Sequence, residues 1–587
     1  MGCRTEGFTT DSDGVQFNRK REWGLRKHQI DRRGTKMLGQ MMKMPLLISS
    51  ILRHAARHHG HVEVVSRRVE GDIHRYTWAD CAVRARQLAS ALESIGIEQG
   101  DRVGTLAWNG YRHLETYYGV SGLGAITHTI NPRLHPDQIA WMIGHAENAA
   151  VAFDLTFLPI VRSIANRCPS VKTWIALCDR SLLPNEAEIE TGIPNLIAYE
   201  DLIQSGSEQW NWPQFDEQQA SGLCYTSGTT GDPKGVLYSH RSTILHAYAS
   251  CLPDAFGFSA RDCILPVVPM FHVNAWGIPY AAALVGAKLV FPGPNLDGRS
   301  LYELFEAEQV TFSGGVPTIW FGLLNHLESH QLRFSSLKRT VIGGSACPPS
   351  MIRAFRERYG VEVLHAWGMT ELSPLGSVCA LQNKHLSEPL EAQQRRLEKQ
   401  GHAFFGVDLR VVNDAGEELP WDGASQGHLQ ARGPWVIESY FKSAGGNPLT
   451  CDAQGEGWFP TGDVATMDSD GYLQITDRSK DVIKSGGEWI SSVDLENLAV
   501  AHPGVAMAAV IGIPHPKWDE RPLLVVVPKP GLVLERSELL QFFDGKVPRW
   551  WVPDDVQFVD SIPLGATGKM LKNRLREQFK DLPSTDS

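Results

Sequence analysis

The order of apolar and polar positions along the chain predicts a layered α/β protein. Apolar residues recur at helical spacing over 79–95, and a Gly100-Asp101 turn separates this helix from an apolar, strand-like run over 103–107. Helix-like and strand-like segments then alternate as far as about Ile475. Such alternation favours sheets made mainly of parallel strands, with helices packed on their faces. We therefore expect a large, multi-layer α/β domain over residues 37–477.

The pattern changes at the charged segment 477–481, which lies between a predicted strand over 472–476 and a Gly-Gly turn at 486–487. Beyond this segment the sequence predicts strands over 505–511 and 523–527 and then a basic helical tail. These elements indicate a second, small α+β domain over residues 478–587.

The two ends of the chain and its cysteines indicate where the protein works. Residues 1–36 are polar and rich in Arg, Lys and Asp, which predicts a disordered leader, with Met37 as an alternative start. No apolar run approaches the ~20 residues that a membrane-spanning helix needs, and the N-terminus lacks the apolar core of a secretory signal. The ten cysteines are scattered without a CxxC pair, which indicates reduced thiols and a cytoplasmic location.

Composition and charge exclude several classes of protein. Hydrophobic residues make up 42% and charged residues 21% of the chain, and the net charge is −10, which is typical of a globular protein and disfavours a general nucleic-acid binder. An acidic protein that binds anions must gather lysines and arginines at the site. The histidine run over 54–61 has no acid or thiol at ligand spacing, so we interpret it as a solvated helix end. We interpret the charged run over 391–400 as a solvated surface helix.

The strongest chemical signal is a loop rich in glycine and hydroxyl residues over 225–235. Its small residues allow backbone N–H groups to surround phosphate oxygens, and a lysine adds positive charge. It is not a Walker A loop, because no Gly-Lys-Ser/Thr closes it. The residues expected to bind phosphate are Thr226, Ser227, Gly228, Thr229, Thr230, Gly231 and Lys234.

This loop resembles the phosphate loop of the adenylate-forming superfamily, which includes acyl-CoA synthetases, adenylation domains of peptide synthetases and firefly-type luciferases. The resemblance runs from about Met37 to Arg576, and the motifs recur in the family's order. It implies a large N-terminal domain, a small mobile C-terminal domain, and the use of ATP, Mg²⁺ and coenzyme A. Within the family the chain is most similar to medium- and long-chain fatty acyl-CoA synthetases.

The resemblance also assigns nucleotide and metal contacts. The segment 367–371 is similar to the family turn that stacks on adenine and holds magnesium through its glutamate, so Glu371 would bind Mg²⁺ with the hydroxyl of Thr226. The metal ion and Lys234 would offset the repulsion between the attacking carboxylate and the α-phosphate. Contacts to adenine and ribose are implied for Gly344, Ser345, Ala346, Trp367, Gly368, Met369, Thr370, Asp463 and Arg478.

Three further matches concern the small domain. Lys480 corresponds to the position where the family's small domain pivots between an adenylate-forming and a thiol-admitting orientation. Gly486 and Gly487 would leave room for the pantetheine arm of coenzyme A beside the backbone. Lys569, in a Gly-x-x-Gly-Lys setting, matches the family lysine that reaches the carboxylate and the α-phosphate during the first half-reaction only.

The segment 269–276 resembles the acyl-binding segment of fatty acyl-CoA synthetases. By this resemblance His272 borders the substrate carboxylate, Trp276 gates the acyl tunnel, and Val316 belongs to a segment, 314–318, that lines the pocket. A histidine and a tryptophan beside an apolar run are also compatible with ordinary core packing. The segment 403–406 departs from the family, which usually has a proline there.

Together the motifs predict an ATP-dependent acid–CoA ligase for medium- or long-chain fatty acids. The acid and ATP would give acyl-AMP and pyrophosphate, and coenzyme A would then displace AMP. The alternatives are a ligase for a short thioether acid such as 3-methylthiopropionate, a ligase for a bulky alicyclic or steroid acid, and an adenylation enzyme that loads a carrier protein. The expected partners are small molecules; the sequence leaves the number of subunits open, a homodimer among the options.

Overall fold

The computed structural model describes residues 39–183, 192–226, 233–486, 488–565, 569–580 and 582. Two units emerge, residues 1–44 and 45–587. Residues 39–44 of the first unit form neither a helix nor a strand, and the predicted leader over 1–36 lies outside the described residues. All the sheets below belong to the second unit.

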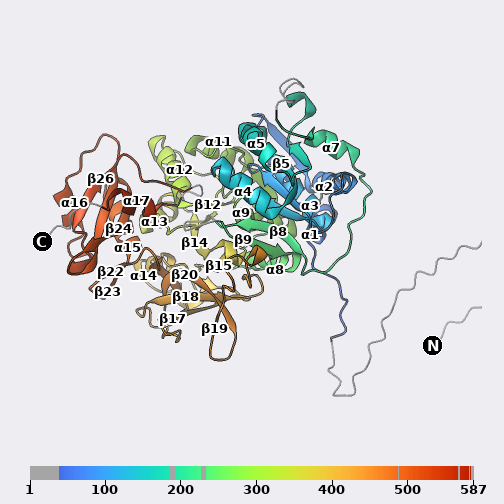
Figure 1. Ribbon diagram of the computed structural model, residues 1–587. Coiled ribbons are helices and arrows are strands. Elements are labelled where there is room, and N and C mark those ends of the chain that lie inside the picture. Colours follow the sequence, from blue (N-terminus) through green and yellow to red (C-terminus); the bar gives the residue numbers. More distant parts are fainter. Residues whose placement is uncertain are drawn as a thin grey trace, which may run out of the picture. The chain divides into compact units, whose positions relative to one another are not determined.

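The first large sheet has seven strands, which are parallel except for the antiparallel pair β8–β9. Its strands, in spatial order, are β7 (Leu196–Ala198), β6 (Thr173–Ala176), β5 (Asn148–Phe153), β3 (Arg102–Leu106), β4 (Ile126–Thr129), β8 (Ala220–Tyr225) and β9 (Gly235–Ser239). The helices between them in the chain are α3 (Tyr111–Leu123), α4 (Pro136–Ala146), α5 (Leu158–Ile164) and α7 (Tyr199–Ser205), with α2 (Trp78–Ser94) before β3 (Figure 1).

The second large sheet has nine strands, with a parallel centre and antiparallel edges. In spatial order they are β16 (His402–Ala403), β15 (Leu375–Val378), β14 (Glu362–Gly368), β13 (Arg339–Ile342), β12 (Phe312–Gly315), β10 (Cys263–Pro266), β11 (Lys288–Phe291), β1 (Glu63–Arg67) and β2 (Ile73–Thr77). The associated helices are α1 (Ile48–His58), α8 (His240–Ser250), α10 (Ile278–Val285), α11 (Gly298–Glu308), α12 (Pro317–Ser329), α13 (Pro349–Arg353) and α14 (Leu390–Leu397).

Two five-stranded sheets follow. The antiparallel one contains β17 (Asp408–Val412), β18 (Gly427–Arg432), β19 (Thr450–Cys451), β20 (Gly457–Met467) and β21 (Leu473–Arg478). The C-terminal one contains β22 (Ile483–Ser485), β23 (Glu488–Ile490), β24 (Val505–His515), β25 (Asp519–Pro528) and β26 (Asp555–Phe558), with helices α15 (Ser492–Val500), α16 (Arg536–Phe542) and α17 (Lys572–Gln578).

Local sequence explains why α2 begins where it does and how it joins the two large sheets. The Thr77 side chain accepts a hydrogen bond from the Asp80 N–H at 3.3 Å, and the Asp80 carboxylate accepts one from the Thr77 N–H at 2.9 Å. This reciprocal pair satisfies two N–H groups that have no partner inside the helix. The first helical residue, Trp78, is fully buried and donates from its indole to the carbonyl of Ala287, immediately before β11.

These observations confirm the predicted mixed α/β fold with largely parallel sheets. The helix expected over 79–95 is α2, and the strand expected over 103–107 is β3. The run over 391–400, interpreted as a solvated surface helix, is a helix to Leu397 and is partly buried, with Gln393, Gln394 and Gln400 in the interior. The Gln393 amide is tolerated there because it donates to two backbone carbonyls.

The charged segment 477–481 begins inside a strand, since Asp477 and Arg478 are the last residues of β21. The Asp477 carboxylate accepts from both the N–H and the hydroxyl of Ser492, each at 2.7 Å. Lys572 in turn donates to that hydroxyl at 2.6 Å. β21 is therefore tied to α15 and α17, while the domain boundary between residues 477 and 478 stays a prediction. Among the helices that the structure describes, none is long and apolar enough to cross a membrane.

Candidate active site

Three residues predicted to bind the nucleotide come together around one carboxylate. Asp463 in β20 is 2% exposed; its Oδ2 accepts from the Trp367 indole N–H at 2.9 Å, and its Oδ1 pairs with Arg478 Nε at 2.9 Å. The positions follow from the sheets: Trp367 lies near the end of β14, and Asp463 and Arg478 are register partners in the β20–β21 pair. This trio presents an indole and a guanidinium held by the same acid.

Glu371, the predicted metal ligand, lies in a short turn just after β14, the strand that contains Trp367. Glu371 is buried, and its Oε1 accepts a hydrogen bond from the Tyr440 hydroxyl at 2.8 Å. The Lys234 Nζ lies 4.9 Å from the centre of the Tyr440 ring, on its face. Tyr440 thus connects the carboxylate predicted to hold Mg²⁺ with the lysine predicted to bind phosphate.

Sequence reasoning missed Tyr440 and also Tyr238, whose hydroxyl donates to the carbonyl of Thr370 at 2.7 Å. Thr370 and the neighbouring Gly368 and Met369 belong to the predicted adenine turn. Neither tyrosine lies within a motif we used. For Tyr238, the signal available was its position in the strand that follows the phosphate loop.

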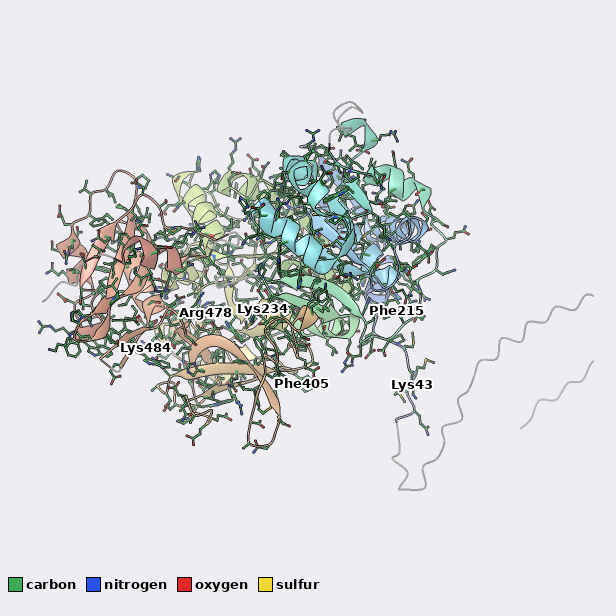
Figure 2. The ribbon with its side chains drawn as sticks, viewed as in Figure 1. Lys43, Phe215, Lys234, Phe405, Arg478 and Lys484 are labelled. Atoms are coloured by element: carbon green, nitrogen blue, oxygen red, sulfur yellow. The ribbon has the colours of Figure 1, made fainter. Side chains whose placement is uncertain are left out.

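The base of the phosphate loop is a closed β-hairpin. The Thr226 N–H donates to the Lys234 carbonyl at 2.9 Å, and the Lys234 N–H donates to the Thr226 hydroxyl at 3.1 Å. Since β8 and β9 are antiparallel, the loop between them returns the chain along the same sheet edge. Ser227, Gly228, Thr229, Thr230 and Gly231 lie outside the described residues. Figure 2 labels Lys234 and Arg478.

Lys569, which follows the C-terminal sheet in the chain, belongs electrostatically to this group. Burial and the positive charge of Arg478 lower the pKa of Lys569 to about 8, while Asp463 and Glu371 oppose that shift. Burial and the charge of Lys569 lower the pKa of His272 to about 3, so the imidazole is neutral. The structure therefore gathers Lys569, His272, Glu371, Asp463 and Arg478 into one charged neighbourhood.

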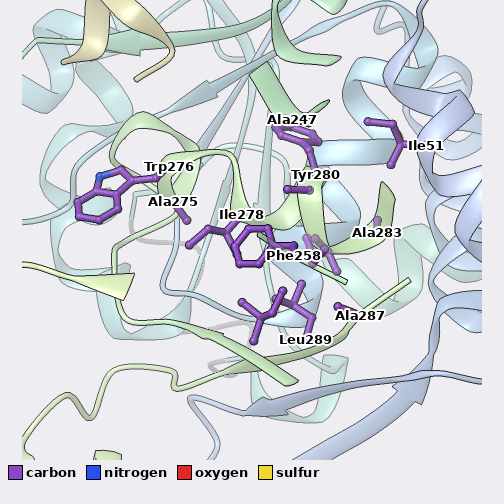
Figure 3. Close-up of a cluster of buried hydrophobic side chains, with 14 of the residues drawn as sticks. Ile51, Ala247, Phe258, Ala275, Trp276, Ile278, Tyr280, Ala283, Ala287 and Leu289 are labelled. Atoms are coloured by element: carbon purple, nitrogen blue, oxygen red, sulfur yellow. The ribbon is translucent and has the colours of Figure 1, made fainter. Parts of the chain in front are cut away.

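The acyl-binding segment has an unusual backbone. Val273, Asn274, Ala275 and Trp276 have φ angles of 45°, 51°, 49° and 57°, the left-handed region that disfavours residues with a Cβ. The turn places the Trp276 indole, 8% exposed, against three glycines: a methyl group on Gly343 would lie 3.5 Å from it, and one on Gly314 or Gly344 3.9 Å. In Figure 3 this indole extends away from Ile278 and Leu289.

The other predicted residues occupy the following places. Val316 directly precedes α12, and a methyl group on Gly344 would lie 3.2 Å from its side chain. Ser345 and Ala346 follow Gly344 in the loop between β13 and α13, and Lys480 is an exposed side chain just after β21. Gly486 lies in the turn between β22 and β23, where its N–H donates to the Trp518 carbonyl at 2.8 Å. Gly487 lies outside the described residues.

The donor set fits a magnesium ion that binds together with substrate. Within the described parts of the chain, no group of three or more His, Cys, Asp or Glu side chains could hold a metal by itself. Magnesium in nucleotide sites is usually bound by one or two carboxylates together with substrate phosphates. One buried carboxylate, Glu371, near the phosphate loop suits that kind of binding.

Two family models match the chain. A family model described as AMP-binding enzyme matches residues 51–441, and one described as AMP-binding enzyme C-terminal domain matches residues 494–569. The chain belongs to the AMP-binding enzyme family. This membership confirms the predicted adenylate-forming fold, with a large N-terminal and a small C-terminal domain, and the prediction of an acid–thiol ligase that uses ATP and coenzyme A and acts through an acyl-adenylate.

Particular relatives are similar over nearly their whole length. The 3-methylmercaptopropionyl-CoA ligase of Ruegeria lacuscaerulensis is 55% identical, covering 93% of this chain and 99% of that protein. The medium-chain-fatty-acid–CoA ligase of Ectopseudomonas oleovorans is 53% identical, covering 93% and 98%. Among solved structures, the anthranilate CoA ligase AuaEII in complex with anthranoyl-AMP has a TM-score of 0.79 at 24% identity, covering 91% of this chain and 98% of that one, and shares the fold.

Lys569→Ala should suppress adenylate formation by ~10²–10³ while sparing thioester formation, because the lysine is predicted to direct its charge at the reacting phosphate. In the wild type, kcat/KM for ATP in pyrophosphate release should fall as the pH rises through about 8, where Lys569 loses its proton. Lys569→Arg, which stays charged, is the matched control and should lose this fall. Supplying pre-made acyl-AMP and coenzyme A isolates the second step. Equal losses of rate in both steps would contradict a role for Lys569 in the first half-reaction only.

Glu371→Gln should raise the magnesium concentration needed for half-maximal adenylation by at least ~10-fold, since an amide oxygen is a weaker ligand than a carboxylate. The amide can still accept from Tyr440, so the fold should persist. A magnesium titration of pyrophosphate release measures the change. Tyr440→Phe is the control, with an intact carboxylate and a smaller shift expected; a Glu371→Gln titration that matches the wild type would contradict the metal role.

Proposed function

We propose that this protein activates a short thioether acid of the 3-methylthiopropionate type. The carboxylate attacks the α-phosphate of ATP, forming acyl-AMP and releasing pyrophosphate; the thiol of coenzyme A then attacks the acyl carbon, forming the thioester and releasing AMP and a proton. The acid has two methylenes, a sulfur and a methyl beyond its carboxyl group, so it needs a short apolar pocket.

The observation that carries this proposal is the position of Trp276. Its indole lies against Gly314, which belongs to the segment predicted to line the acyl pocket, and against Gly343 and Gly344 at the start of the predicted adenine loop. We infer that an indole in this place leaves room for only a short acyl chain. A thioether sulfur also makes favourable contacts with an aromatic ring, worth roughly 0.3–1.5 kcal/mol, which a hydrocarbon chain of equal length lacks. The naming of the 55% identical relative points to the same acid.

A medium- or long-chain fatty acid, our expectation from the sequence, is the second candidate. The relative at 53% identity carries a medium-chain name, so sequence similarity separates the two by little. The strained turn at 273–276 favours this candidate in one respect. Each left-handed residue costs roughly 1–2 kcal/mol, and a backbone that relaxed would move the indole and lengthen the pocket. The relatives support the thioether acid better than the fatty acid.

The proposal assigns roles to the gathered side chains. Lys234 and Lys569 stabilise negative charge on the phosphates, Glu371 and Thr226 hold Mg²⁺, and His272 borders the carboxylate. The adenine contacts lie in segments 344–346 and 367–370, and the ribose contacts are Asp463 and Arg478. Lys480 is the pivot, and Gly486 and Gly487 accommodate pantetheine. A cytoplasmic location and a homodimer stay predictions.

Release of AMP across a panel of acids tests the substrate. We expect kcat/KM to rise up to 3-methylthiopropionate and straight acids of four to six carbons, because each buried methylene adds ~0.8 kcal/mol, about fourfold in binding, and to fall for longer acids that do not fit. Trp276→Ala should open the pocket and move the peak to longer acids, with the KM for ATP unchanged. Trp421→Ala, which removes a half-exposed indole in a loop, is the matched control.

The panel also includes steroid, alicyclic and aromatic acids, each with and without coenzyme A. If kcat/KM of the wild type rises steadily up to acids of eight or more carbons, the thioether acid is contradicted and a fatty acid is the better substrate. Pyrophosphate release in the presence of coenzyme A with no thioester product would instead favour the carrier-loading alternative.

A further inference from the structure

His365 is a buried histidine in the interior of β14, two residues before Trp367. It is 1% exposed, and its backbone carbonyl accepts from Cys379. No motif singled it out, and its ring does not belong to the charged neighbourhood described above. Its ring nevertheless contacts the end of the predicted adenine loop directly and β21 through Gln400.

The hydrogen bonds fix which ring nitrogen carries the proton. Nδ1 lies 2.9 Å from the Glu398 carbonyl, which can only accept, so Nδ1 is the donor. Nε2 therefore accepts, from the Cys347 N–H at 3.3 Å and from the Gln400 amide at 3.2 Å. Burial lowers the pKa of His365 to about 4, which agrees with a neutral ring at physiological pH.

The two donors to Nε2, Cys347 and Gln400, belong to different segments of the chain. Cys347 directly follows Ala346 in the loop that contains Gly344, Ser345 and Ala346, the predicted adenine contacts. Gln400 connects His365 to β21, the strand that ends at Arg478, because its Oε1 accepts from the Ile475 N–H at 2.6 Å. His365 itself sits in the strand that leads to Trp367. His365 and Gln400 together thus connect the adenine loop, the strand of Trp367 and the strand of Arg478.

We propose that His365 and Gln400 form a positioning pair for the adenine nucleotide. The pair sets the spacing between the adenine loop and the strands that carry Trp367 and Arg478, and it touches neither the acid nor coenzyme A. This inference rests on the proposed function for the assignment of the adenine loop. Its ligand is the AMP moiety, shared by ATP and acyl-AMP.

Two substitutions of the same histidine separate positioning from simple support of the fold. In His365→Gln the amide oxygen can replace Nε2 and accept from Cys347 and Gln400. In His365→Asn the amide nitrogen can replace Nδ1 and donate to Glu398, but the acceptor facing the loop is lost. Both variants remove the imidazole and leave a buried amide, so a merely structural role predicts similar effects for the two.

The measurement is AMP binding to the full-length protein by calorimetry, with the KM values for ATP, acid and coenzyme A alongside. We expect His365→Asn to weaken AMP binding and raise the KM for ATP by roughly 5–10-fold, the range of a lost hydrogen bond. His365→Gln should stay within about twofold. The KM values for acid and coenzyme A should not change in either variant. Equal effects of the two substitutions on AMP binding, or none, would overturn the proposal.

Gln400→Met gives an independent arm if both histidine variants fail to fold. It keeps the bond from Cys347 to His365 and removes the connection to Ile475, so AMP binding should weaken by about 3–5-fold. An unchanged AMP affinity in this variant overturns the proposal. A wild-type protein that binds no AMP would count against the proposed function itself, because none of these AMP measurements depends on which acid is the substrate.

Discussion

A carboxylate withdrawn from water must have its oxygens satisfied by partners, and Asp463 imposes this constraint on the whole nucleotide site. Leaving a buried charge without a partner costs several kcal/mol. Both oxygens of Asp463 are used, one by the Trp367 indole and one by the Arg478 guanidinium. Because Trp367 belongs to the nine-stranded sheet and the other two belong to a five-stranded sheet, the same interaction fastens the two sheets together. The predicted ribose contacts Asp463 and Arg478 lie at their junction.

The second constraint is charge. An acidic chain that binds a polyphosphate must hold several cations close together, and these repel one another unless anions lie between them. In this site acidic side chains are the anions: Asp463 lies against Arg478, and the buried Glu371 accepts from Tyr440, whose ring faces Lys234. Burial is the main cause of the lowered pKa of Lys569, and the neighbouring cations, Arg478 first, lower it further. An incoming phosphate would relieve that repulsion, since added negative charge raises the pKa of a nearby lysine.

Local patterns in the sequence were sufficient for much of the architecture. Helix α2 was predictable because its apolar stripe and its Thr77–Asp80 cap are local features. Contacts between distant segments were not predictable from patterns: Tyr440 is 69 residues from Glu371, and Gln400 is 75 residues from Ile475. Through family resemblance, the sequence motifs identified most of the side chains that gather at the site. They did not locate His365, because a buried histidine in a strand is equally typical of an ordinary core, and only its three partners distinguish it.

The left-handed turn at 273–276 shows how the acyl end and the phosphate end of the site depend on the same strand. Asparagine tolerates a positive φ better than most residues, and Asn274 is also held by its side chain, whose Oδ1 lies 3.3 Å from the Tyr117 hydroxyl and 3.5 Å from the Cys224 sulfur. Tyr117 in addition donates to the Met270 carbonyl. Cys224 lies in β8, two residues before Thr226. The backbone that presents Trp276 to its glycines is therefore braced against the strand that opens the phosphate loop. A substitution that enlarges the acyl pocket through this turn acts on β8 as well, whereas one that trims the indole alone does not.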